Sequence, residues 1–149
     1  MPKAIPEGIR SITPAITVDG CAEAIETWKK AFGAEEQVRA ADPSGKKVWH
    51  AALRIGDSAF FCNDRFPEMP APPAARLWLY QENVDRGFKR AKDAGLKVVY
   101  PPTDMFWGDR VAEVHDRWGN QWVLAQHVKD LSPDEMNKAR DAFVASMKK

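Results

Sequence analysis

The sequence has 149 residues, a formal net charge of +1 and two cysteines. A chain of this length buries roughly two-thirds of its surface when it folds, so it needs neither disulfides nor a structural metal. The 22 basic and 21 acidic residues are balanced, which argues against a nucleic-acid partner because such a partner requires a clustered basic surface. Cys21 and Cys62 form no CxxC pair, so we expect reduced thiols and no zinc site of that kind.

The hydropathy of the chain argues against secretion and membrane insertion. No run of apolar residues reaches the length of about 18 that a membrane span needs. The N-terminal stretch "MPKAIPEGIRSITPAI" also lacks the apolar core of a secretory signal. We therefore expect a soluble, cytoplasmic protein that has neither a membrane nor a nucleic acid as its partner.

Residues 11–64 predict a module with the order β-α-β-β-β. Residues 11–18 are rich in β-branched side chains and end at an Asp-Gly turn, which is typical of a strand. Residues 21–33 carry apolar side chains at helical spacing, and Gly33 is placed to end the helix. A further strand and a β-hairpin that turns at Gly56 complete the module.

The same order of elements recurs after a linker. Residues 65–75 contain four prolines and have no hydrophobic periodicity, which is typical of a linker. Residues 76–128 then predict a second module, again with a strand, a helix, a strand and a hairpin. Residues 132–147 predict a C-terminal amphipathic helix, because Ser132 begins a capping-box pattern. The apolar face of this helix must pack on its own domain or on a second subunit.

Three segments resemble those of a known superfamily. They are the helix "DGCAEAIETWKKAFGAE", the first hairpin "HAALRIGDSAFFCND" and the second hairpin "FWGDRVAEVHDRWGNQWVLAQHV". With the paired modules, they resemble the vicinal-oxygen-chelate superfamily of glyoxalases, bleomycin-resistance proteins and extradiol dioxygenases, and most closely its PhnB-like branch. The resemblance covers about residues 12–136 and implies a single α+β domain, residues 1–149, with the glyoxalase-like fold. In that fold two βαβββ modules form a curved mixed sheet around a cavity, usually within a homodimer; here the C-terminal helix is added.

The resemblance also implies four metal-ligand positions in the metal-dependent members, two in each module. Here they fall near Thr13 and near His50 or Ala52 in the first module, and near Arg76 and Val123 in the second. Only His50 is a good ligand for a borderline metal, whereas a catalytic site of the glyoxalase type needs three or four donors. We therefore expect neither a bound metal nor another cofactor.

Three polar residues are candidates for acid–base catalysis. Glu113 and His115 lie two residues apart, so strand alternation places both side chains on one face. If that face is concave, they form an acid–base pair with His50 nearby; if it is convex, they are solvated surface residues. His50 itself fits a hydrogen-bonded contact as well as a position in the cavity wall.

Four of the six tryptophans exceed what the core of a small sheet needs, namely Trp49, Trp78, Trp107 and Trp122. Aromatic walls with a few polar groups are typical of a pocket for a planar small molecule. The stretch "FWGDR" is the strongest single indication, because Gly108 permits a sharp bend that turns the two aromatic side chains inward. The candidate ligand-binding residues are Trp78, Phe106, Trp107, Arg110, Trp122 and His50.

Two functions from different classes remain open. In the first, a metal-free homodimer binds an aromatic or amphipathic small molecule in the concave cavity, as the bleomycin-resistance members of the superfamily do. In the second, the protein is an isomerase, lyase or dioxygenase that uses His50, Glu113 and His115. The incomplete ligand set and the number of tryptophans favour binding, and the face of the sheet that Glu113 occupies discriminates between the two.

Overall fold

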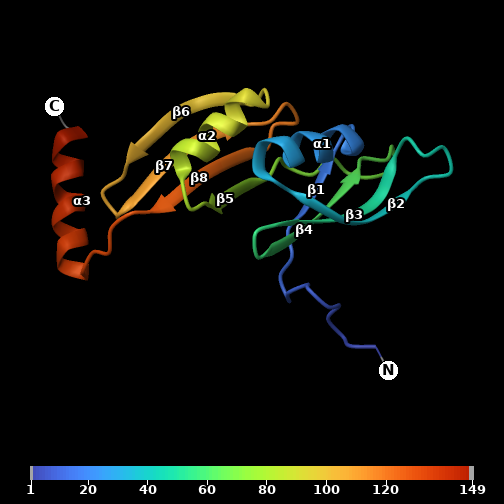
Figure 1. Cartoon of the computed structure of the whole chain (residues 1–149), viewed down its shortest axis with the longest axis horizontal. Coiled ribbons are helices and arrows are strands. Elements are labelled where there is room, and N and C mark those ends of the chain that lie inside the picture. The colour runs from blue at the N-terminus through green and yellow to red at the C-terminus, as the bar shows by residue number, and fades with distance from the viewer. Residues whose placement is uncertain (1, 148–149) are drawn as a thin grey trace. The chain divides into compact units, whose positions relative to one another are not determined.

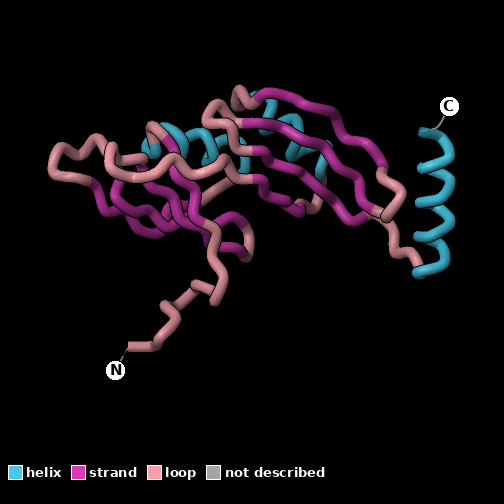
Figure 2. Tube along the Cα trace, turned by 180° about the vertical axis from the view of Figure 1, so that it is seen from behind, coloured by secondary structure: helices cyan, strands magenta, loops and turns pink. Residues whose placement is uncertain are grey.

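The structure is a computed structural model that describes residues 2–147. The chain forms two compact units, each of which has most of its residue contacts within itself. Unit 1 extends to Ala75 and includes the turn Arg117–Asn120. Unit 2 consists of Arg76–Asp116 and the residues from Gln121 onward. Each unit contains one four-stranded sheet. Figures 1 and 2 show the strands of both units.

Unit 1 has the β-α-β-β-β order that the sequence predicts for its first module. Its elements are β1 (Ala15–Val18), α1 (Cys21–Phe32), β2 (Glu35–Ala41), β3 (Val48–Ile55) and β4 (Ser58–Asp64). The strand order is β1-β4-β3-β2, with β1 parallel to β4 and the other pairs antiparallel. The first strand is shorter than the expected residues 11–18, because Pro14 has no N–H to donate to a neighbouring strand.

The helix α1 covers one face of the unit 1 sheet (Figure 1). The side chains that helical spacing places on one side of α1 are buried: Cys21, Ala24, Ile25, Trp28, Ala31 and Phe32. Trp28 is fully buried and meets the ring of Phe60 edge-on, with ring centroids 5.7 Å apart. The free thiols of Cys21 and Cys62 lie in the same core, with their Sγ atoms 2.7 Å apart. This apolar layer holds α1 on the sheet.

One buried carboxylate, that of Asp64 at the end of β4, joins three segments of unit 1. Its Oδ1 accepts hydrogen bonds from the backbone N–H groups of Gly20 and Cys21, at 2.9 and 3.0 Å. Its Oδ2 accepts a third hydrogen bond, from the N–H of Val48, at 2.7 Å. Asp64 therefore caps the start of α1 and fixes the start of β3, since side-chain acceptors satisfy the N–H groups that helix and strand termini leave unpaired.

Unit 2 repeats this order of elements and adds the C-terminal helix. Its elements are β5 (Arg76–Tyr80), α2 (Val84–Asp93), β6 (Lys97–Asp104), β7 (Asp109–His115), β8 (Gln121–His127) and α3 (Pro133–Met147). The strand order is β5-β8-β7-β6, with β5 parallel to β8, as β1 is to β4 in unit 1. The α+β fold with two βαβββ modules is thus confirmed.

The helix α3 begins with the capping box that the sequence predicts. The N–H of Glu135 donates to the hydroxyl of Ser132, and the N–H of Ser132 donates to the carboxylate of Glu135. Figure 2 shows α3 beside the ends of the unit 2 strands. Its described residues are not buried, and its apolar side chains include the exposed Met136, Phe143 and Met147. No helix within residues 2–147 has the length and hydropathy of a membrane span.

The helix α2 packs on one face of the unit 2 sheet. The N–H of Val84 at the start of α2 donates to the side chain of Gln126, so the even-numbered residues of β8 face this helix. The odd-numbered residues of β8 therefore lie on the opposite face, which we call the open face. Trp78 pairs in register with Val123, and Tyr80 with Ala125, so both aromatic side chains share the open face.

Candidate ligand-binding site

Three aromatic side chains gather on the open face of unit 2. We call Trp78, Tyr80 and Trp107 the aromatic cluster. The ring centroid of Trp78 lies 6.2 Å from that of Tyr80 and 6.3 Å from that of Trp107, and the ring planes are tilted by 37° and 49°. Trp78 is 46% exposed and Tyr80 is 58% exposed, whereas Trp107 is half-buried and packs on Val111, Val123 and Ala125. Two rings are therefore open to a ligand and a third is anchored in the core.

A buried carboxylate, that of Asp109, holds two of these rings in place. Its Oδ2 accepts hydrogen bonds from the Tyr80 hydroxyl at 2.9 Å and from the Trp107 Nε1 at 3.1 Å. Its Oδ1 accepts one from His127 Nδ1 at 2.8 Å. Burial raises the pKa of Asp109, but the hydrogen bonds from His127, Tyr80 and Trp107 outweigh it, so the pKa lies below its ordinary value. Asp109 is thus ionised at neutral pH.

Gly108 allows the chain to bend sharply before Asp109, as the sequence indicates. Its φ is +98°, which other residues rarely adopt, and a Cβ here would overlap the carbonyl oxygen of Lys129. The Gly108 carbonyl accepts hydrogen bonds from the N–H groups of Val128 and Lys129. The bend directs Trp107 onto the open face, because the chain reverses between β6 and β7 at this point.

His127 lies between two carboxylates. Its Nδ1 donates to Asp109, and its Nε2 donates to the exposed Asp130 at 2.7 Å. The hydrogen bond to Asp109, followed by that to Asp130, raises the pKa of His127 above its ordinary value. Since the folded-state pKa is raised, the protonated ring stabilises the fold at low pH, and this contribution is lost as the pH rises through the folded-state pKa.

We expect an NMR titration to give His127 a pKa above the value of 6.5 for an unperturbed histidine. In Asp109→Asn the pKa should fall, because the imidazolium loses its buried anionic partner. The matched variant Asp130→Asn should lower it less, since Asp130 is fully solvated. A wild-type pKa at or below 6.5, or an equal fall in both variants, contradicts this account.

Glu113 and His115 also lie on the open face, and they are in contact. The buried Glu113 carboxylate accepts a hydrogen bond from His115 Nε2 at 2.8 Å and pairs with the Arg76 guanidinium at 3.0 Å. Glu113 therefore orients the half-buried His115, whose Nδ1 is the nitrogen that accepts a proton in this tautomer. The predicted Glu–His pair forms, whereas His50, the third catalytic candidate, lies on β3 of unit 1.

Two candidate ligand-binding residues lie on the other face of the sheet. Trp122 is 2% exposed, faces α2 and donates from Nε1 to the buried Asp116 at 3.0 Å. It is a core residue, which corrects the expectation that it lines the site. Arg110 faces α2 as well, where Asp85 and Asp104 bind its guanidinium and raise its pKa. Neither side chain is part of the aromatic cluster, because strand alternation directs both away from the open face.

The remaining two candidate ligand-binding residues, Phe106 and His50, each contact a phenylalanine ring. Phe106 meets Trp107 edge-on, with centroids 5.1 Å apart, and lies 5.3 Å from the ring of Phe143 on α3. It lines a hollow of about 460 Å³ beside α3 rather than the open face. His50 is exposed in unit 1 and meets the ring of Phe61 edge-on at 4.7 Å. Phe106 therefore contacts the Trp107 ring of the cluster and also lines the hollow beside α3.

The residues at the implied metal-ligand positions do not fit a metal. Thr13 precedes β1 and donates its hydroxyl to a backbone carbonyl, and Arg76 is paired with Glu113. Val123 is fully buried and has no donor atom. Within residues 2–147, no three His, Cys, Asp or Glu side chains gather as a metal site would require. A single histidine, His50, is too few donors for such a site.

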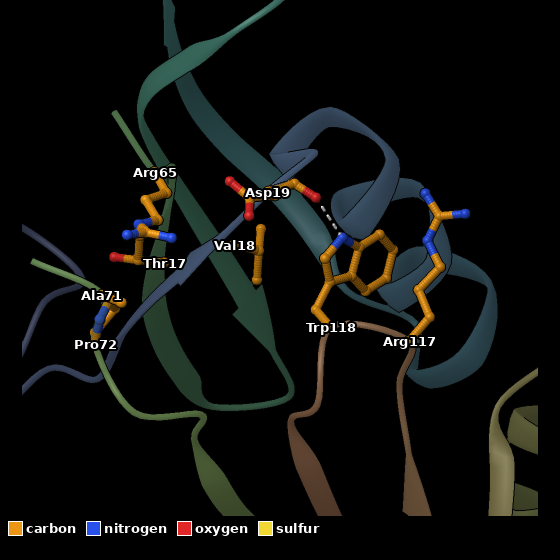
Figure 3. Close-up of a pocket in the computed structure, with 8 residues that line it drawn as sticks. All are labelled: Thr17, Val18, Asp19, Arg65, Ala71, Pro72, Arg117 and Trp118. Atoms are coloured by element: carbon orange, nitrogen blue, oxygen red, sulfur yellow. Dashed lines mark hydrogen bonds between the residues drawn. The ribbon is translucent and has the colours of Figure 1, made fainter. Parts of the chain in front are cut away.

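A hollow of about 550 Å³ in unit 1 was not foreseen from the sequence (Figure 3). Its wall is made by Thr17, Val18, Asp19, Arg65, Ala71, Pro72, Arg117 and Trp118. Trp118 Nε1 donates to the Asp19 carbonyl at 2.7 Å, and the Arg117 guanidinium lies 4.6 Å from the Trp118 ring. These residues come from three distant segments, namely the end of β1, the proline-rich linker and the turn after β7. No local pattern signals such a combination.

Solved structures with the same fold support this architecture. The chain is similar to TioX from Micromonospora sp. ML1, with a TM-score of 0.64 and 22% identity, over 79% of this chain and all of that one. It is also similar to a PhnB protein from Bacillus cereus, with a TM-score of 0.61 and 18% identity, over 78% of this chain and 99% of that one. At these identities the likeness establishes the fold alone.

Sequence comparison reaches further than the fold. An uncharacterized protein of Mycobacterium bovis is 36% identical over 139 residues, which are 87% of this chain and 91% of the relative. Residues 9–124, which include β1 and most of β8, match the family described as the Glyoxalase/Bleomycin resistance protein/Dioxygenase superfamily. Since the match spans both modules and the modules have the glyoxalase-like fold, the chain belongs to this superfamily.

Proposed function

We propose that this protein binds an aromatic or amphipathic small molecule over the aromatic cluster, without a metal. The observation that carries the proposal is the group of Trp78, Tyr80 and Trp107, two of them about half exposed, around a buried carboxylate. Exposed aromatic side chains that are held rigidly by hydrogen bonds are typical of ligand sites, because little conformational entropy is lost on binding. The superfamily contains binding proteins as well as enzymes, which is consistent with this role.

The expected affinity follows from the rings. Aromatic stacking contributes about 0.5–1.5 kcal/mol per ring pair beyond the burial of apolar surface. A planar ligand that covers the Trp78 and Tyr80 rings, both already within 6.2 Å of each other, makes two such contacts. Together with the buried area, these contacts are enough for micromolar affinity, which corresponds to about 8 kcal/mol.

We expect planar heterocycles to quench the tryptophan fluorescence of the wild type, and Trp78→Ala to abolish the saturable part. Trp78 is half exposed, so its removal should cost less than about 1 kcal/mol of stability. The matched control is Trp49→Ala, because Trp49 is 55% exposed but lies in unit 1, stacked on Phe66. If no compound quenches the wild type, or if both variants lose the signal equally, the proposal fails.

We also propose that the protein is a cytoplasmic homodimer. The apolar side chains on α3, including Phe143 and Met147, are exposed, and an interface of at least roughly 1,000 Å² with a second copy covers them. Sedimentation at tens of micromolar should give the mass of a dimer. Removal of the chain from Ser132 onward should shift that mass to a monomer; a monomeric wild type contradicts the proposal.

A second candidate function is proton transfer by the Glu113–His115 pair. The buried Glu113 orients His115 on the same face as the aromatic cluster, which is the arrangement of a general base and its positioning carboxylate. In D₂O, such a base exchanges the protons next to the carbonyl of a ketone probe, and NMR detects the exchange. His115→Gln should abolish this exchange and leave binding intact. Equal exchange in wild type and variant excludes this role.

A further inference from the structure

We propose that the aromatic cluster selects an organic cation, one whose charge is spread over a flat ring or shielded by alkyl groups. The inference rests on the proposed binding function and names the class of ligand for that site. It follows from the position of the Asp109 carboxylate, which lies at the edge of two of the rings and accepts a hydrogen bond from each. A cation over these rings therefore meets both their negative faces and a buried anion.

The hydrogen bonds from the rings to Asp109 make their faces more attractive to a cation. Tyr80 donates its hydroxyl and Trp107 its indole N–H to the same Oδ2 atom, at 2.9 and 3.1 Å. A donor that shares its proton with an ionised carboxylate gains electron density, and this density extends into its π system. The face of an aromatic ring already carries a negative potential, so both rings become better partners in a cation–π contact.

The charges around the cluster also favour a cation. Asp109, His127 and Asp130 form a chain of hydrogen bonds in which two carboxylates face one imidazole, so its net charge is negative even when His127 is protonated. The neighbouring Glu113 is neutralised by Arg76. Of the cations on this face, Arg76 and His127 are engaged by carboxylates, and Lys97, in register with His115, lies six residues along β7 from Asp109. A ligand cation would balance the net negative charge of Asp109, His127 and Asp130.

The kind of cation follows from the cost of removing its water. A primary ammonium ion is strongly hydrated, and the faces of aromatic rings replace that water only in part. A quaternary or aromatic cation is weakly hydrated and keeps its attraction to the rings. The spacing of 6.2 to 6.3 Å between ring centroids leaves no gap in which a ligand fits between two rings, so the cation lies across them.

The test compares two probes of the same shape. N-methylquinolinium and 1-methylnaphthalene have the same fused rings and methyl group, but only the first is charged. We expect equilibrium dialysis to show that wild-type protein binds the cation about tenfold more tightly. In Asp109→Asn the ratio of the two affinities should fall below twofold. The control Asp93→Asn removes an exposed carboxylate from α2, on the covered side of the sheet, and should keep the preference.

The outcomes separate the inference from the proposed function. Equal binding of both probes by the wild type overturns the cation preference and leaves aromatic binding standing. Failure of both probes to bind overturns the proposed function as well. If Asp109→Asn does not fold, Tyr80→Phe decides, because it keeps the ring and removes the hydroxyl that donates to Asp109. A cation preference that is unchanged in Tyr80→Phe then refutes the inference.

Discussion

Replacement of Asp64 by Ala should lower the free energy of unfolding by about 3 kcal/mol or more, since each buried N–H left without an acceptor costs about 1–3 kcal/mol. Asp64 accepts from the N–H groups of Gly20, Cys21 and Val48, and its side chain is buried. The alanine variant leaves all three donors unpaired and creates a small cavity. The start of α1 should fray first, because two of these donors belong to its first turn.

Urea denaturation followed by circular dichroism measures this loss. The matched control is Asp57→Ala, since Asp57 is an exposed carboxylate in the β3–β4 turn that accepts a hydrogen bond from Ser58. Its loss should cost less than about 0.5 kcal/mol. Asp64→Asn keeps one acceptor oxygen and should be intermediate. Equal stability of Asp64→Ala and Asp57→Ala means that Asp64 does not hold these segments together.

Trp122→Ala should destabilise the protein by about 3–5 kcal/mol, the usual cost of truncating a large buried aromatic side chain. Trp122 is 2% exposed and packs on the α2 side of the unit 2 sheet, with its indole N–H bonded to Asp116. Its removal leaves a large cavity beneath the helix. The midpoint of urea unfolding should therefore fall strongly, with no specific effect on ligand binding.

The comparison with Trp78→Ala distinguishes the core from the site. Both residues are tryptophans of unit 2, on adjacent strands, but Trp78 is 46% exposed. Trp78→Ala should leave the unfolding midpoint almost unchanged and abolish ligand quenching. Trp122→Phe should cost about 1–2 kcal/mol, because it keeps most of the volume and loses one hydrogen bond. If Trp122→Ala is stable but no longer binds ligand, then Trp122 belongs to the ligand site and not to the core.

The local pattern of the sequence was sufficient for the elements and their order. Both module helices bury the side chains that recur at helical spacing, and α3 begins at the capping box of Ser132 and Glu135. The resemblance in the two hairpins also led to the correct superfamily. Helical periodicity, capping and turn chemistry act over a few residues, so one sequence contains all the information that they need.

The faces of the unit 2 sheet, in contrast, were decided only in the tertiary structure. Four consecutive residues of β8, from Trp122 to Ala125, are buried, so the strand has no alternation of apolar and polar residues from which to read its two faces. The contact between Gln126 and Val84 places the even-numbered residues under α2. This register directs Trp122 into the core and Glu113 onto the open face.

The candidate site shows the same division between sequence and structure. The sequence by itself determined the two modules, the bend at Gly108 and the adjacency of Glu113 and His115. Only the tertiary structure joined Asp109 to Tyr80 and His127, which lie 29 and 18 residues away in the chain. The physical reason is that a hydrogen bond between distant side chains depends on strand pairing and register, which non-local packing selects.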